Sequence, residues 1–137
     1  MAIEPQASRG HSAPCSGEDF DFFYQGLETR QLLVQTCEAC GVLRNPPSPS
    51  CMHCGSFDWS GRPVSGKGVV YSYITHHHPP LPGFETPHTV VLVELAEGLR
   101  LLGALAPDQQ DRVSIGSEVS VEFLRREGVA LFRFTLD

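Results

Sequence analysis

The sequence predicts a mainly β protein, in which a short N-terminal helix precedes a four-cysteine ribbon and a five-stranded barrel. Three observations lead to this prediction. They are an aromatic stretch with helical spacing, two CxxC pairs in the first half of the chain, and five β-rich segments after Gly66. With 137 residues, the chain can bury one moderate core or two small units that share an interface.

The N-terminal part divides into a tail and a helix. Residues 1–17 are small and polar, with two prolines and no periodicity, so we expect a disordered tail or a linker. Residues 18–36 are predicted to form a short amphipathic helix and a lead-in strand at 32–35. The helix is indicated by an apolar stripe with spacings of three and four: Phe20, Phe23, Tyr24 and Leu27. This stripe packs either on its own domain or on a partner, and both readings stay open.

Two matched cysteine pairs, Cys37/Cys40 and Cys51/Cys54, dominate residues 37–62. Each pair is followed by glycine, which enters the left-handed turn of such a loop without steric cost. Four thiolates satisfy the tetrahedral shell that Zn²⁺ prefers and leave no position for a catalytic water. We therefore expect a structural zinc ribbon, with rubredoxin-like iron as the alternative ion. Phe57 and Trp59 are expected to cover its apolar side.

Other uses of these cysteines fit the pattern less well. No apolar secretory segment occurs in residues 1–14, so we expect a reducing, cytoplasmic setting in which disulfides are disfavoured. A redox site needs one reactive CxxC at a helix start, whereas two matched pairs occur here. Each CxxC pair with the residues between its cysteines forms a hook around the metal. His53 could compete as a ligand, although the hook in which it lies already supplies the thiols of Cys51 and Cys54. Cys15 lies apart from both pairs.

The remaining residues, 63–137, read as a β domain. Alternating and β-branched residues predict strands at 68–75, 88–95, 99–105, 118–124 and 130–135, and Pro107–Val113 predicts a short helix between the third and fourth. Five strands with a helix at that place match an OB-type barrel, and an SH3-like barrel is the nearest alternative.

Charge and composition exclude some functions. The formal net charge is −6, and Lys67 is the only lysine, which disfavours a protein whose main task is binding a nucleic-acid backbone. No run of about eighteen apolar residues is present that could span a bilayer. The sequence also lacks a Ser/His/Asp order, a Rossmann fingerprint and a phosphate-cradling loop.

Together, these motifs resemble the DUF35 family, also called OB-fold acyl-CoA-associated proteins. The resemblance covers about residues 19–136. The ordered combination of motifs carries it, and they lie at 20–27, 33–41, 44–47, 51–56, 65–73, 77–84 and 93–98. It implies an N-terminal helix, a rubredoxin-like zinc ribbon and a C-terminal OB fold.

The family resemblance also implies an accessory role. Members of the family partner thiolase-like enzymes and help to form the acyl-CoA site. Some pair with lipid-transfer-protein-type thiolases in a retro-aldolase, a lyase of steroid degradation that cleaves a steroid side-chain CoA ester to propionyl-CoA and a C17 ketone. Others bridge acetoacetyl-CoA thiolase and HMG-CoA synthase in archaea. We expect a subunit that is not catalytic alone.

Candidate contacts with the partner or acyl-CoA lie on the helix and in a histidine-rich, proline-rich loop: Phe20, Phe23, Tyr24, His77, His78, Pro79, Pro80, Gly83 and Phe84. Four histidines and Glu85 in residues 76–88 could also form a second metal site or an acid–base pair. Five basic residues could meet CoA phosphates or be solvated surface charge: Arg44, Lys67, Arg100, Arg125 and Arg126.

Two functions outside the accessory class stay open. An OB fold can bind single-stranded nucleic acid, which predicts salt-sensitive binding of oligonucleotides. A hydrolase built on the histidine loop predicts a second metal equivalent per chain.

Overall fold

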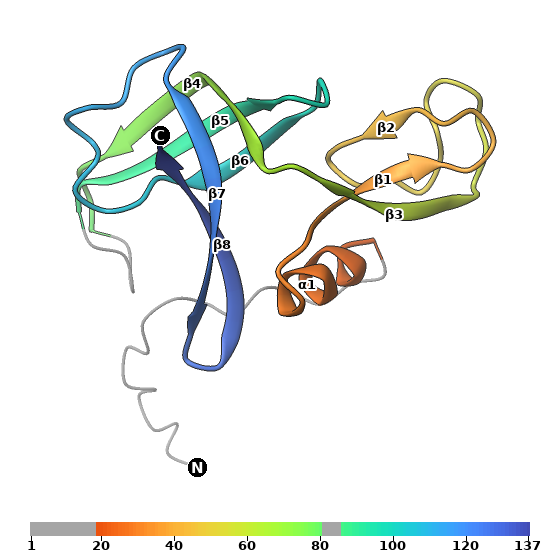
Figure 1. Cartoon of the computed structure of the whole chain (residues 1–137), viewed down its shortest axis with the longest axis horizontal. Coiled ribbons are helices and arrows are strands. Elements are labelled where there is room, and N and C mark those ends of the chain that lie inside the picture. Colours follow the sequence, from red (N-terminus) through yellow and green to blue (C-terminus); the bar gives the residue numbers. More distant parts are fainter. Residues whose placement is uncertain (1–18, 81–85) are drawn as a thin grey trace.

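The computed structural model describes residues 19–80 and 86–137 (Figure 1). One helix and eight strands follow one another in these residues. Predictions about the tail at 1–17, Cys15, Gly83, Phe84 and Glu85 lie outside them. None of the described helices is long and apolar enough to cross a membrane.

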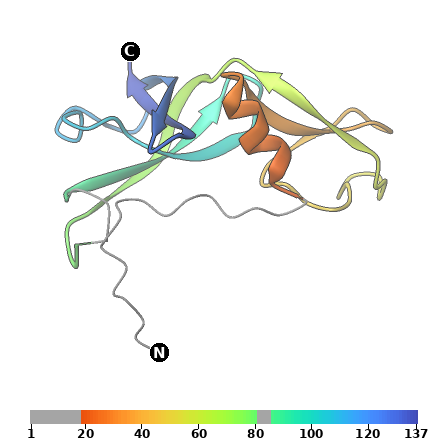
Figure 2. The same ribbon diagram turned by 90° about the horizontal axis from the view of Figure 1, so that it is seen from below.

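The predicted N-terminal helix is present as α1, Asp21–Glu28. Its aromatic side chains are half-buried against other elements of the molecule. The ring centroid of Phe22 lies 4.9 Å from that of Trp59, and the centroid of Phe23 lies 5.6 Å from that of Phe132. Figure 2 shows α1 lying across the junction between the two sheets.

The first sheet contains three antiparallel strands in the order β2-β1-β3: β1 (Leu32–Cys37), β2 (Leu43–Arg44) and β3 (Trp59–Val64). β3 was not predicted, although it pairs with β1 from Leu32 opposite Val64 to Cys37 opposite Trp59. The expectation for Phe57 was wrong, because 74% of its surface is exposed and it does not cover the ribbon. Trp59 is half-buried against α1.

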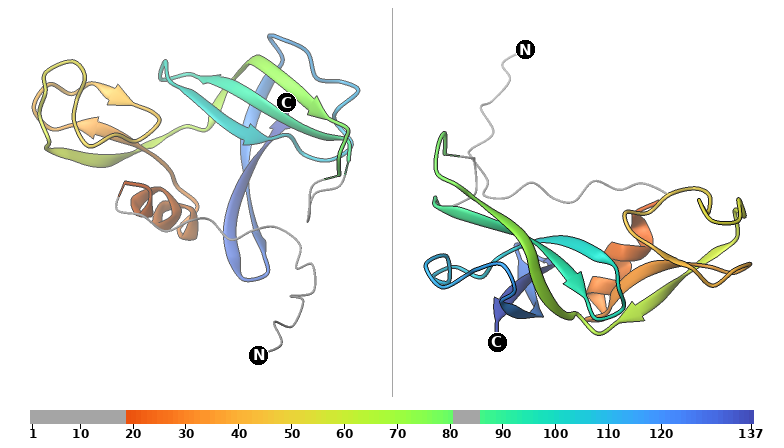
Figure 3. Two further views of the ribbon diagram at one scale, coloured as in Figure 1. Left: turned by 180° about the vertical axis from the view of Figure 1, so that it is seen from behind. Right: turned by 90° about the horizontal axis from the view of Figure 1, so that it is seen from above.

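The second sheet is the OB-fold domain, with five antiparallel strands in the order β6-β5-β4-β7-β8. All five predicted strands are present, as β4 (Lys67–His76), β5 (His88–Leu95), β6 (Arg100–Ala104), β7 (Glu118–Arg126) and β8 (Val129–Leu136). A parallel bridge between Leu105 and Phe134 brings the two edge strands together. Seen from behind, β5 and β6 lie in front of β7 and β8 (Figure 3).

The predicted helix at Pro107–Val113 is absent, and this segment consists of turns. Asp108 has a φ of 70°, a left-handed conformation that cannot continue a right-handed helix. The Gln109 side chain instead forms hydrogen bonds with β8. It donates to the Thr135 hydroxyl at 2.9 Å and accepts from the Leu136 N–H at 2.8 Å. The connection between β6 and β7 is therefore held by side-chain hydrogen bonds to β8.

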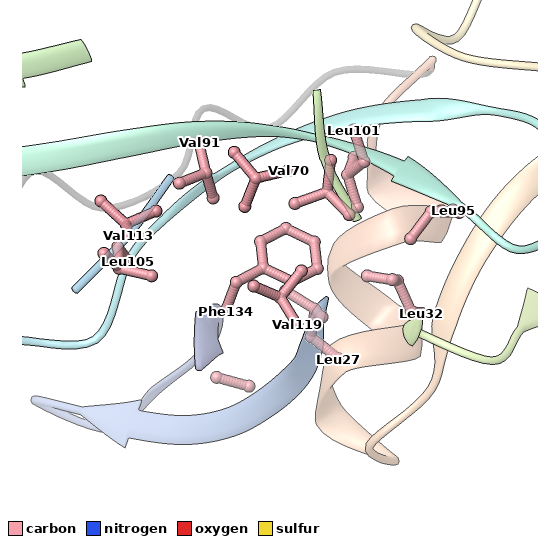
Figure 4. Packing of buried hydrophobic residues seen from close by; sticks show 12 residues of the cluster. Leu27, Leu32, Val70, Val91, Leu95, Leu101, Leu105, Val113, Val119 and Phe134 are labelled. Atoms are coloured by element: carbon pink, nitrogen blue, oxygen red, sulfur yellow. The ribbon is translucent and has the colours of Figure 1, made fainter. Parts of the chain in front are cut away.

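A single core joins the two sheets. Phe134, with none of its surface exposed, lies among aliphatic side chains from β4, β5 and β7 (Figure 4). Leu27 of α1 and Leu32 of β1 belong to the same buried cluster. Gly103 lets β6 approach closely, because a Cβ there would lie 2.8 Å from the Phe134 ring. The helix and the ribbon are thus packed on the barrel.

Candidate metal centre

The four predicted cysteines converge at the end of the first sheet. The Sγ atoms of Cys37 and Cys54 are 3.6 Å apart, as are those of Cys40 and Cys51. All four sulfurs lie within 4.8 Å of one another. Sulfurs at about 2.3 Å from a tetrahedral Zn²⁺ are about 3.8 Å apart, so the cluster has the dimensions of a four-thiolate metal site.

The two hooks have the same backbone geometry. In the first, the Gly41 N–H donates to the Cys37 carbonyl at 2.8 Å. In the second, the Gly55 N–H donates to the Cys51 carbonyl at the same distance. Both glycines are left-handed, with φ values of 78° and 79°. This repeat explains why each CxxC pair is followed by glycine.

Electrostatics divide the four thiols into two groups. The Cys40 backbone N–H, directed at the Cys37 sulfur, lowers the pKa of Cys37 to about 6. At Cys40 the Val42 N–H also lowers the pKa, but burial and the neighbouring sulfurs outweigh it and raise the pKa to about 12. The pKa is lowered for Cys51 and raised for Cys54. Four adjacent thiolates need a bound cation, and the cluster fits one.

In the described part of the chain, these cysteines form the only group of three or more metal-ligating side chains. His53 is not in the cluster. A second metal site of histidines with Glu85 is not formed among the described residues, and Glu85 itself lies outside them. His76 instead places Nε2 2.6 Å from the Pro79 carbonyl oxygen, and it pairs with His88 across the β4–β5 ladder.

A buried polar contact behind the hooks was not foreseen. Gln35, with none of its surface exposed, accepts hydrogen bonds at Oε1 from Arg44 Nε (2.7 Å) and from the Ser48 N–H (2.8 Å). Arg44 Nη2 also donates to the Ser48 carbonyl at 3.1 Å. Arg44 therefore holds the loop between the hooks. The available signal was a glutamine directly after three apolar residues of β1.

Two further basic candidates also have partners within the chain. Arg125 forms an ion pair of 2.6 Å with Glu28 of α1. Arg100 forms one of 3.4 Å with Glu94, and its guanidinium carbon lies 3.7 Å from the Tyr71 ring centroid. These contacts favour structural roles over phosphate binding. Lys67 is exposed.

The predicted contact residues fall into two environments. Phe23 and Tyr24 pack against the core, whereas 45% of the surface of Phe20 is exposed. Four residues after β4 are exposed: His77, His78, Pro79 and Pro80. The structure thus brings the cysteines together but does not gather the contact residues into one site. Contact with a partner or acyl-CoA stays a prediction for all of them.

Two family models match consecutive parts of the chain. The protein-family model described as "ChsH2, rubredoxin-like zinc ribbon domain" matches residues 25–60. The protein-family model described as "ChsH2, C-terminal OB-fold domain" matches residues 61–124. A DUF35 domain-containing scaffold protein of Methanocaldococcus jannaschii is 33% identical over 106 residues, which are 74% of this chain and 74% of that protein.

Two longer relatives are named as hydratase subunits. A probable enoyl-CoA hydratase alpha subunit of Thermomonospora curvata is 44% identical, over 90% of this chain and 38% of the relative. The 3-oxo-4,17-pregnadiene-20-carboxyl-CoA hydratase alpha subunit of Mycobacterium tuberculosis is 38% identical, over 81% and 35%. The chain thus spans little more than a third of the length of these relatives.

A solved structure matches the chain over almost its own full length. A chain of the structure titled "Ltp2-ChsH2(DUF35) aldolase" superposes with a TM-score of 0.85 at 43% identity. The match covers 90% of this chain and 98% of that one.

Proposed function

Because the chain belongs to the DUF35 family, with ChsH2-type zinc ribbon and OB-fold domains, we propose that it is an accessory subunit of a thiolase-like enzyme. In this role it does not carry out catalysis alone. It binds the enzyme and helps to form the acyl-CoA site. One observation carries the proposal: the 43% identity to a chain of an aldolase complex, of which 98% is matched.

The reaction we propose for the complex is retro-aldol cleavage of a steroid side-chain CoA ester. The C17 hydroxyl gives up its proton, the bond between C17 and the α-carbon of the thioester breaks, and C17 becomes the ketone. The electron pair passes to the thioester enolate, which takes a proton to give propionyl-CoA. The step is redox-neutral, so this chain need not supply a redox cofactor.

The ion we propose is Zn²⁺, held by Cys37, Cys40, Cys51 and Cys54. Their sulfur separations fit a zinc–thiolate tetrahedron. With four protein ligands, zinc contributes to folding energy and does not activate a water. The protein would work in a reducing compartment, the cytoplasm, where the thiols remain available to the metal.

The test is co-expression with a candidate thiolase-like enzyme of the lipid-transfer-protein type. We expect a stable complex that releases propionyl-CoA from the steroid CoA ester only when both chains are present. A thiolase-like enzyme that is soluble and fully active alone would overturn the proposal.

A second function is favoured by the two hydratase subunits, in which a similar module is about a third of a longer chain. On this reading, the domain serves an enoyl-CoA hydratase or another acyl-CoA enzyme, such as a thiolase or acyltransferase complex. Assaying the same complexes for enoyl-CoA hydration separates this function from the retro-aldol reaction.

The nucleic-acid alternative predicts salt-sensitive binding of labelled single strands, and the net charge of −6 disfavours it.

A further inference from the structure

The outer face of β4, β5 and β6 is defined by the register of the sheet. Residues directly opposite each other in antiparallel strands project on the same face. Val70, Val93 and Leu101 are opposed and buried, so this row faces the core. The next row toward the β4–β5 loop, Ser72, Leu92 and Leu102, must then face outward.

Four of the most exposed large apolar side chains lie on or beside this outer face. The exposed fractions are 66% for Ile74, 62% for Leu102, 48% for Tyr71 and 40% for Val69. The neighbouring Val90 and Leu92 are half-buried and complete the patch. We call these six residues the outer apolar face.

A β-bulge creates this arrangement. The pairing of β4 with β5 shifts between Val70 and Ser72, so Tyr71 is inserted as an extra residue. Without the insertion, strand alternation would turn Ile74 toward the core and Tyr73 toward solvent. The bulge thus places Ile74 and Tyr71 on the same outer surface as Leu102.

Apart from the Arg100 side chain over the Tyr71 ring, no helix or further strand in the described part of the chain covers the outer apolar face. The helix packs on β1 and β8, and β7 pairs with β4 only at Lys67–Val69. The view from behind shows β5 and β6 in front of the rest of the barrel (Figure 3). Large contiguous apolar patches on soluble domains mark interaction sites.

The chemistry of the face selects its occupant. Its charged pair, Arg100 and Glu94, is internally satisfied, and Arg100 also covers the Tyr71 ring. An OB face that binds nucleic acid needs unpaired cations with exposed stacking aromatics, whereas this one is largely aliphatic. It therefore suits an uncharged, apolar protein surface.

We propose that the outer apolar face is the surface on which the partner enzyme subunit docks. This inference rests on the proposed accessory function, since the solved relative is titled as a complex of Ltp2 with a ChsH2 DUF35 chain. The face is also continuous with the exposed residues that follow β4, His77–Pro80, where the sequence predicted partner contacts. The occupant is thus an apolar patch of the enzyme subunit.

The test compares the same substitution at two exposed isoleucines. Ile74→Asp changes the outer apolar face, and Ile115→Asp changes the β6–β7 connection, where the side chain is 71% exposed. The zinc-loaded chain is titrated with Ltp2 of the solved aldolase and with the enzyme from the co-expression test. We expect Ile74→Asp and Leu102→Asp each to weaken binding at least about tenfold, as for a buried interface residue. Ile115→Asp should bind like the wild type.

Other outcomes decide against the proposal. Folded Ile74→Asp and Leu102→Asp that bind the enzyme like the wild type would overturn it. If Leu102→Asp does not keep its zinc and the wild-type circular dichroism spectrum, Leu102→Ser takes its place in the binding measurement. A wild-type chain that is a dimer alone, and that Ile74→Asp makes monomeric, would assign the face to a second copy. A wild-type chain that binds neither enzyme contradicts the proposed function itself.

Discussion

At the scale of single residues, the hooks place four thiols where they cannot all ionise unaided. The pKa of Cys37 is lowered to about 6 by the Cys40 N–H. The pKa of Cys40 is raised to about 12, because burial and nearby sulfurs outweigh the Val42 N–H. A divalent cation removes the repulsion, which couples metal binding to both proton release and folding.

This coupling predicts that zinc affinity falls as the pH falls. Near neutral pH, binding must displace the protons held by Cys40 and Cys54, whose pKa values are raised. Two protons correspond to a loss of about a hundredfold in affinity per pH unit. The slope steepens below about 6, where Cys37 also becomes protonated. Competition with a zinc chelator over a pH series measures how the zinc affinity depends on pH. A pH-independent affinity would contradict the four-thiolate assignment.

Replacing a ligand should abolish the site. We expect Cys54→Ser to lower the zinc content from one equivalent per chain to nearly none and to unfold the ribbon. Structural zinc supplies on the order of 10 kcal/mol of apparent binding energy in zinc-finger peptides. Metal analysis and thermal unfolding measure both effects. Cys15→Ser is the matched control and should keep one equivalent. A Cys54→Ser variant that assembles normally with the enzyme, but loses turnover, would show that the metal is not structural.

At the scale of elements, the contact between α1 and β1 depends on a glycine. A Cβ at Gly26 would lie 2.7 Å from Leu33 Cγ and 3.0 Å from the Gln31 carbonyl oxygen. Alanine would gain about 1 kcal/mol of helix propensity over glycine. It would also force the helix away from the strand, which costs about 1–3 kcal/mol in a packed site.

We therefore expect Gly26→Ala to destabilise the zinc-loaded protein by up to about 2 kcal/mol. The adjacent Gln25 is exposed, so Gln25→Ala should change the stability by less than about 0.5 kcal/mol. Denaturant unfolding of both variants measures the difference. A Gly26→Ala variant more stable than the wild type would mean that α1 does not pack as closely as the structure shows.

The elements that the sequence predicted are those with local signals. Alternation in HTVVLVEL predicted β5 with its correct ends. β3 (WSGRPV) was missed because Gly61 and Pro63 are typical of loops. It forms because β1 pairs along its length, and proline is tolerated on an edge strand. The helix predicted at Pro107–Val113 is absent because Asp108 has a left-handed φ of 70° and the next residue, Gln109, bonds to β8, a contact distant in sequence.

The same distinction applies to the sites at the scale of the whole molecule. The cysteine cluster was predictable because its ligand spacing is local in sequence. The outer apolar face was not, because the side on which Ile74 lies depends on the register with β5 and on the bulge at Tyr71. Nor could the sequence show whether the aromatic helix packs within the chain. That depends on Phe132, more than a hundred residues away.

The ribbon and the barrel are linked by a shared core and by polar contacts. Leu27 and Leu32 lie in the same apolar cluster as the barrel residues. The Asn45 side chain donates to the Arg100 carbonyl at 2.8 Å, and the Glu97 carboxylate accepts from the Ser65 N–H at the same distance. Loss of zinc should therefore weaken the barrel as well as the ribbon.

This linkage predicts a single unfolding transition. Trp59 is the only tryptophan and lies in β3 against Phe22, so its fluorescence reports on the ribbon and helix. Far-ultraviolet circular dichroism is dominated by the barrel strands. For a cooperative unit, the two signals give the same midpoint, and a chelator lowers both midpoints together. If the chelator shifts only the Trp59 signal, the ribbon unfolds separately and does not stabilise the barrel that carries the outer apolar face.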